Sequence, residues 1–153
     1  MPIAVNGSGT ITGISVGGLP DGIVDADMLA ANAVTEAKLA TDQQQGLAKA
    51  WVNFDGTGTL AVRDSFNVTS VTDNGTGDYT VNFAANALAN ANYCITGSVS
   101  WGTNQSRNIL SVATQNGTGY TASTTTALRL ESVNYGNGSA YDANSCSIAV
   151  FGG

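Results

Sequence analysis

The side chains best suited to binding another molecule are aromatic residues set among asparagine, threonine and serine. Trp101 and Tyr120 lie near the ends of expected strands, and Tyr135, Asn137 and Tyr141 share one polar loop. Aromatic rings stack on the apolar faces of sugars, while amides and hydroxyls bond to sugar hydroxyls. We predict that these five residues contribute to a receptor site for glycan. Core positions for Trp101 and Tyr120 remain the alternative, whereas we expect Tyr135 and Tyr141 to be exposed.

Catalytic chemistry has few candidates in this chain. There is no histidine, which removes the common nucleophilic triads and imidazole metal sites. Asp73 and Asp78 flank an expected hairpin tip, where acids are ordinarily solvated, and no calcium-loop spacing accompanies them. Gly75 and Gly77 form one of several glycine pairs in the sequence. Phosphate-binding glycine loops lead into a helix, whereas none of these pairs does. We therefore predict a protein that is not an enzyme and has no metal and no cofactor.

Composition excludes two further classes of partner. The 153 residues carry a formal net charge of −6, which opposes binding to the phosphate backbone of nucleic acid. No apolar run approaches the roughly 20 residues that cross a bilayer, so membrane insertion is not expected.

Only 10% of residues are charged, and glycine, serine, threonine and asparagine dominate the polar set. This mixture is typical of short strands joined by tight turns.

The elements that must position the aromatic residues are strands from residue 51 onward. Alternation of apolar and polar residues begins at Trp51, and residues 71–83 read as a hairpin with Asn74-Gly75 in its turn. Further strands are expected at 93–101, 108–113, 125–133 and 145–151. We predict an antiparallel β-sandwich, jelly-roll-like, over residues 51–153. Cys94 and Cys146 fall in separate strands of it and are expected to be small buried free thiols.

The first 50 residues have a different organisation. Residues 1–20 hold short, glycine-punctuated strands that we expect to attach to another protein, and 21–50 form a repeat and neck segment. Residues 23–30 are echoed ten positions later by 33–40, a unit too short to bury its apolar face alone. Thr41 or Asp42 is expected to cap a short helix carrying Leu39, Gln43, Leu47 and Ala50 on one face. The residues assigned to a three-chain neck are Leu29, Val34, Leu39, Leu47 and Trp51; the alternative is a plain linker.

The sequence resembles a known class of proteins over residues 19–83. Residues 33–40, Ala-Val-Thr-Glu-Ala-Lys-Leu-Ala, are similar to the Ala-Val-Thr-x-Ala-Lys-Leu-Ala repeats of tailed-bacteriophage fibre proteins. The block Lys-Ala-Trp-Val-Asn-Phe at 49–54 and the hairpin at 70–83 resemble a β domain of those proteins. The resemblance carries no catalytic residues.

The resemblance implies a homotrimer assembled in the host cytoplasm and located in the virion. Its N-terminal segment would bind another virion protein of the tail, baseplate or capsid, and its sandwich would face the host. We therefore expect a short tail fibre for adhesion to the host surface through glycan. A capsid head fibre or decoration protein without a receptor role is the alternative, and a polysaccharide-cleaving enzyme is a third and weaker one.

Overall fold

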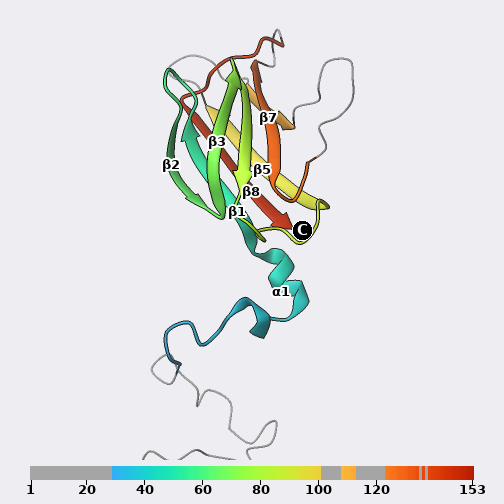
Figure 1. The fold of residues 1–153 in the computed structure, drawn as a ribbon. Coiled ribbons are helices and arrows are strands. Elements are labelled where there is room, and N and C mark those ends of the chain that lie inside the picture. The colour runs from blue at the N-terminus through green and yellow to red at the C-terminus, as the bar shows by residue number, and fades with distance from the viewer. Residues whose placement is uncertain (1–28, 101–107, 113–122, 135, 137) are drawn as a thin grey trace, which may run out of the picture. The chain divides into compact units, whose positions relative to one another are not determined.

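The computed structural model describes residues 29–100, 108–112, 123–134, 136 and 138–153. The chain divides into two compact units, Met1–Leu39 and Ala40–Gly153. The described part of the first unit contains one short 3-10 helix, η2 (Glu36–Lys38). The second unit contains helix α1 (Thr41–Gly46) and the strands of a β domain (Figure 1). Predicted site residues Trp101, Tyr120, Tyr135 and Asn137 lie outside the described residues.

Eight strands in the described residues form two antiparallel sheets of four. Sheet A has the order β2-β1-β8-β5 and sheet B the order β3-β4-β7-β6. The strands are β1 (Ala48–Asp55), β2 (Ala61–Phe66), β3 (Val68–Gly75), β4 (Asp78–Phe83), β5 (Tyr93–Ser100), β6 (Asn108–Val112), β7 (Ala127–Asn134) and β8 (Ser145–Gly152).

The predicted mainly β architecture with two packed antiparallel sheets is confirmed. The jelly-roll-like order is not what the topology shows. A jelly roll places most successive strands in opposite sheets, whereas β1-β2, β3-β4 and β6-β7 are each neighbours within one sheet. Short connections explain this for β1-β2 and β3-β4, because tight turns pair consecutive strands directly, whereas residues 113–126 lie between β6 and β7.

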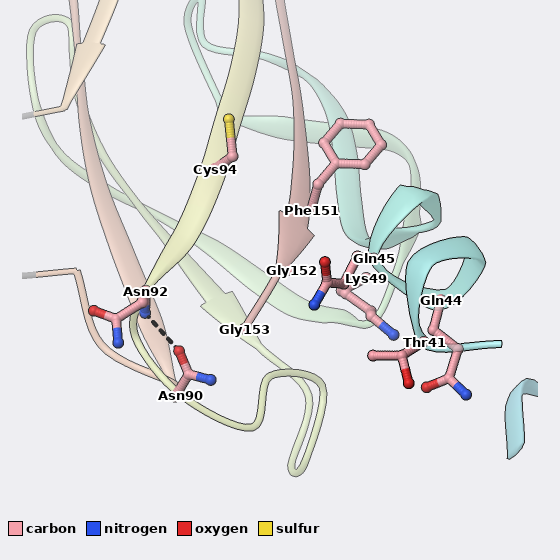
Figure 2. Close-up of a pocket in the computed structure, with 10 residues that line it drawn as sticks. All are labelled: Thr41, Gln44, Gln45, Lys49, Asn90, Asn92, Cys94, Phe151, Gly152 and Gly153. Atoms are coloured by element: carbon pink, nitrogen blue, oxygen red, sulfur yellow. Dashed lines mark hydrogen bonds between the residues drawn. The ribbon is translucent and has the colours of Figure 1, made fainter.

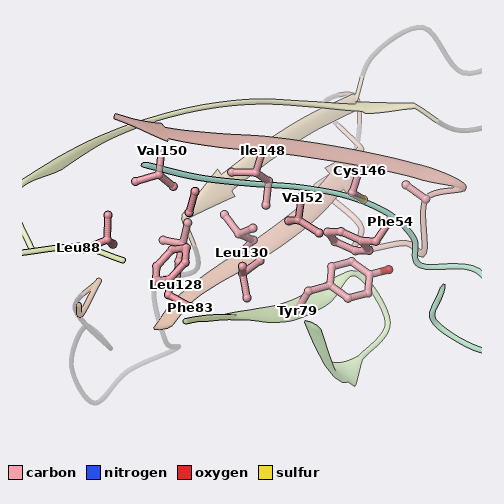
Figure 3. Close-up of a cluster of buried hydrophobic side chains, with 13 residues drawn as sticks. Val52, Phe54, Tyr79, Phe83, Leu88, Leu128, Leu130, Cys146, Ile148 and Val150 are labelled. Atoms are coloured by element: carbon pink, nitrogen blue, oxygen red, sulfur yellow. The ribbon is translucent and has the colours of Figure 1, made fainter. Parts of the chain in front are cut away.

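The core lies between the sheets and comes from the inward parity of the central strands (Figure 3). Strands β1, β4, β7 and β8 alternate buried and half-buried residues, as the period-two pattern predicts. The rings of Phe54 and Tyr79 pack edge to face across the sheets, with centroids 5.0 Å apart. Tyr79, Val81 and Phe83 occupy alternate positions of β4 and are all buried, so they share the face of the strand that lines the core.

The turn of the predicted hairpin differs in detail from the expectation. Gly75 pairs with Asp78, so the loop residues are Thr76 and Gly77 rather than Asn74 and Gly75. Gly75 and Gly77 have φ angles of 136° and 69°, which only glycine adopts without strain. Asn74 stays in the strand, where its side-chain amide donates to the Thr80 hydroxyl at 2.8 Å.

The predicted helical face before the sandwich is wrong. Helix α1 ends at Gly46, and its N-cap is Ala40, which makes no side-chain capping bond. Leu47 is the C-cap, and Ala50 is a fully buried residue of β1. The alternating pattern that starts at Ala48 therefore outweighs the helical spacing, because burial in the core stabilises more than a weak, glycine-containing helix. Trp51, which we assigned to the neck, is also part of β1.

The two cysteines are free thiols, as predicted, but only one is buried. Cys146 points into the core from β8, whereas Cys94 is exposed on the outer face of sheet A. Their strands are neighbours, yet the alternation of side chains puts the thiols on opposite faces, so they are not positioned to form a disulfide.

A thiol reagent should distinguish the two cysteines. Burial raises the pKa of Cys146 to about 12, so its reactive thiolate is scarce at neutral pH. At pH 8 we expect one equivalent of an aromatic disulfide reagent to react rapidly with the native chain. The second equivalent should react only after unfolding in guanidinium chloride. Cys94→Ser is the control and should abolish the rapid phase, while two rapid equivalents in the native chain would contradict the assigned burial.

Candidate functional site

Tyr141 is the one predicted receptor residue that the structure describes, and it is less exposed than expected. It is half-buried and packs against the core cluster, and its backbone N–H donates to the Ser132 carbonyl at 3.1 Å. Burial raises the pKa of its phenol. The expectation of an exposed Tyr141 is therefore wrong, because its polar loop folds down onto sheet B.

The predicted neck residues fall in different parts of the chain. Leu29, Val34 and Leu39 belong to the first unit, and Leu47 and Trp51 belong to the second. Leu29 and Val34 are 44% and 57% exposed, and Leu47 is 46% exposed. Three large apolar side chains are thus left in water by the single chain.

The outer face of sheet B is polar, and its groups are largely bonded to one another. The Asn82 amide donates to the hydroxyls of Ser70 and Thr72, each at 3.0 Å. Arg129 and Asp78 form an ion pair with hydrogen bonds from two guanidinium nitrogens. This face is typical of a solvated surface that has little unused bonding capacity.

The Arg129–Asp78 pair predicts a pH dependence of stability. Hydrogen bonding from Arg129 holds the pKa of Asp78 below its usual value of 3.8. The stabilisation is therefore complete above about pH 4 and is lost as the pH falls through the lowered folded-state pKa. When the pH is lowered from 5 to below the folded-state pKa of Asp78, we expect the unfolding free energy of Asp78→Asn to fall less than that of the wild type. Urea titrations at each pH measure this difference. Parallel pH profiles for the two proteins would contradict this role.

The outer face of sheet A has a different character, set by the register of β1, β8 and β5. One row across these strands is Trp51, Ala149 and Thr96. The next row is Asn53, Ser147 and Ser98. An aromatic ring and an amide on β1 therefore face two hydroxyls on β5, with only small side chains between them.

These two rows form a shallow trough of about 370 Å³, which we call the Trp51 trough. Trp51 and Asn53 lie on one side, Thr96 and Ser98 on the other, and Ala149 and Ser147 form the floor. The trough is within the size range of small-molecule sites. Its lining, as far as the structure describes it, contains neutral side chains only.

The Asn53 side chain is held in place by its neighbours. Its amide nitrogen donates to the Ser147 hydroxyl at 2.7 Å, and Arg63 donates to its carbonyl oxygen at 3.4 Å. Arg63 is itself fixed by an ion pair with Asp55 at 2.9 Å and by a bond to the Asn144 carbonyl. Hydrogen bonds from Thr57, with a smaller contribution from Arg63, lower the pKa of Asp55, so the pair stays ionised.

A second concave surface lies where α1 meets the sandwich (Figure 2). This pocket has a volume of about 610 Å³. Side-chain amides from α1 and from the loop before β5 surround it, together with the Phe151 ring and the Cys94 thiol. One of these amides already makes a hydrogen bond within its own loop, since the side-chain oxygen of Asn90 accepts the backbone N–H of Asn92 at 2.8 Å. The lining residues are Thr41, Gln44, Gln45, Lys49, Asn90, Asn92, Cys94, Phe151, Gly152 and Gly153.

Other site types find no support in the described part of the chain. It contains no cluster of three histidine, cysteine, aspartate or glutamate residues that could hold a metal ion. Asp73, one of the acids considered for calcium, instead accepts the backbone N–H of Gly75 at 2.9 Å. None of the helices described is both long and apolar enough to span a membrane.

The protein is an antiparallel β-sandwich with two different outer faces. On sheet B the polar side chains bond to one another, and sheet A carries the Trp51 trough, whose described lining is uncharged. No family model, curated protein or solved structure matches the chain. The fold class therefore rests on the strand topology. The functional assignment has to come from the sequence resemblance and from the chemistry of the surface.

Proposed function

We propose that the chain is a structural protein of a bacteriophage virion, a short homotrimeric tail fibre that adheres to glycan on the host surface. The observation that carries this proposal is the difference between the two outer faces of the sandwich. Sheet B bonds its polar groups internally, whereas sheet A offers an aromatic ring near the Thr96 and Ser98 hydroxyls, which have no hydrogen-bond partner among the described residues. The resemblance of residues 19–83 to fibre proteins supports the same assignment.

The exposed apolar side chains support association of several copies. Leu29, Val34 and Leu47 are each more than two-fifths exposed in the single chain. Burying them between chains would be favourable at roughly 25 cal/mol per Å² of apolar surface. Three copies would also present each adhesive site three times, and multivalency can raise avidity by about 10²–10⁴ without any strong single contact. A shallow, weak site is sufficient in such an assembly.

Adhesion makes no demand for catalytic groups, so we propose a non-enzymatic role. Binding requires surface complementarity, and the described residues supply rings, amides and hydroxyls for it. A polysaccharide-cleaving enzyme would release reducing ends from envelope glycan. We expect none to be released when the purified full chain is incubated with such material.

Immunogold labelling of purified virions tests the proposal. Antibodies against the full chain should decorate the tail of particles that contain it. Labelling of the capsid would favour a head fibre or decoration protein instead. Absence of the chain from purified particles, with the chain present in the soluble lysate, would contradict a virion role altogether.

A further inference from the structure

We propose that the Trp51 trough is a saccharide site that holds one sugar ring against the Trp51 indole. This inference rests on the proposed adhesive function and places its glycan contact on sheet A. It also gives Trp51 a role different from the neck role predicted from the sequence. Three properties of the trough fit a sugar: its shape, its unused hydrogen-bonding groups and the neutral side chains of its described lining.

The shape follows from strand register. Trp51 and Thr96 each pair with Ala149, so they stand one strand to either side of it. Neighbouring strands are about 4.8 Å apart, which separates the backbones of Trp51 and Thr96 by roughly 10 Å. The residue between them is Ala149, whose side chain is only a methyl group. The hollow of about 370 Å³ along this row gives room for a flat ring beside Trp51.

The bonding groups around this space are available to a ligand. Among the described residues, none forms a hydrogen bond with the side chains of Thr96 or Ser98, and none accepts one from the Trp51 indole N–H. Ser147 accepts a hydrogen bond from Asn53, which leaves its own O–H to donate. Because Asn53 is already fixed by its neighbours, binding would cost little side-chain entropy there.

A sugar fits this combination better than other classes of ligand. A pyranose ring has an apolar C–H face for the indole and hydroxyls at its edge for Ser98, Ser147 and Thr96. A purely apolar ligand would cover the Thr96 and Ser98 hydroxyls without giving them hydrogen-bond partners, which is unfavourable. An ionic ligand would meet no opposite charge among the described lining residues.

An NMR titration of the full chain tests this site. The sequence contains two tryptophans, so two indole N–H signals are expected, and Trp51→Phe assigns them. The probes are glucose, galactose, mannose and N-acetylglucosamine, each added to millimolar concentration. We expect at least one sugar to shift the Trp51 signal saturably. Thr96→Val combined with Ser98→Ala should weaken that affinity by about tenfold, since two hydrogen bonds are lost.

The control is Phe66→Ala, which removes another exposed aromatic ring of the same face. Phe66 pairs with Trp51 on the side away from Ala149, so this variant should keep most of the affinity. The proposal is overturned if no sugar moves the Trp51 signal, or if only the Trp101 signal moves. It is also overturned if Trp51→Ala remains folded but loses its oligomeric state in light scattering, because the face would then be an interface between copies.

The failure of this site and the failure of the proposed function are separable. A chain that labels the virion tail but shows no Trp51 shift would remain a fibre, with the saccharide site rejected. A saturable Trp51 shift in a chain that is absent from virions would support the site and reject the fibre.

Discussion

Gly77→Ala should lower the unfolding free energy by more than about 4 kcal/mol, among the largest single-residue losses expected in a domain of this size. Gly77 has a φ of 69°, which costs a residue with a side chain about 1–2 kcal/mol. An added Cβ would also lie 2.6 Å from the Ser132 carbonyl oxygen and 2.7 Å from the Tyr141 nitrogen. Both are backbone atoms, so no side-chain rotation can relieve the clash.

Gly58→Ala is the matched control for backbone strain. Gly58 has a nearly equal φ of 62°, but no atom lies within 4 Å of an added Cβ. We expect it to lose only about 1–2 kcal/mol in urea denaturation followed by circular dichroism. Equal losses in the two variants would show that the turn is not packed against Ser132 and Tyr141 as described.

Asp142→Ala is expected to cost about 2–4 kcal/mol, through two donors left without a partner. One carboxylate oxygen of Asp142 accepts the Gly77 backbone N–H at 2.7 Å and the Tyr79 hydroxyl at 3.0 Å. Tyr79 is fully buried, so water cannot replace this bond without opening the core. Burial and the Asp142 hydrogen bond also raise the pKa of the Tyr79 phenol, which remains neutral.

Asp142→Asn separates the loss of the acceptor from the loss of the charge. The asparagine keeps a carbonyl oxygen where the carboxylate oxygen was, so both donors retain a partner. We expect it to retain at least half of the free energy that Asp142→Ala loses, in the same urea experiment. A loss as large as that of the alanine variant would mean that the charge, and not the shared oxygen, stabilises this end of the sandwich.

These two predictions concern the end of the sandwich opposite α1 (Figure 1). There the β3–β4 turn is bonded through Gly77 to Asp142 and Ser132, and Gly56 donates to the Ala143 carbonyl at 2.8 Å. Connections from three parts of the chain are thereby fixed to one another. Their loss should unfold the domain cooperatively, because the same contacts close over the ring of Tyr79.

Local pattern was sufficient to predict most strands and which residues share a face. Period-two alternation put Val52 and Phe54 on the face opposite Trp51 and Asn53, and the structure buries both. In β4 the same alternation accounts for the burial of Tyr79. Such predictions succeed because alternation along a strand depends only on neighbouring residues.

The candidate site depends on contacts that the sequence does not display. The alternation showed that Trp51 and Asn53 share one face of a strand, but their neighbours Ala149 and Thr96 come from strands distant in sequence. Register between such strands is set by the whole sandwich. Tyr141 was misjudged for a related reason, since its loop is polar in sequence but packs against a glycine from another hairpin.

The native mass of the full chain in solution, measured by light scattering beside residues 40–153, tests the fibre proposal most directly. The shorter chain begins at Ala40 because β1 starts at Ala48, and removal of residues 1–50 would delete the buried Ala50. We predict three times the chain mass for the full chain and a weaker assembly for residues 40–153. A monomeric full chain would contradict the trimeric fibre.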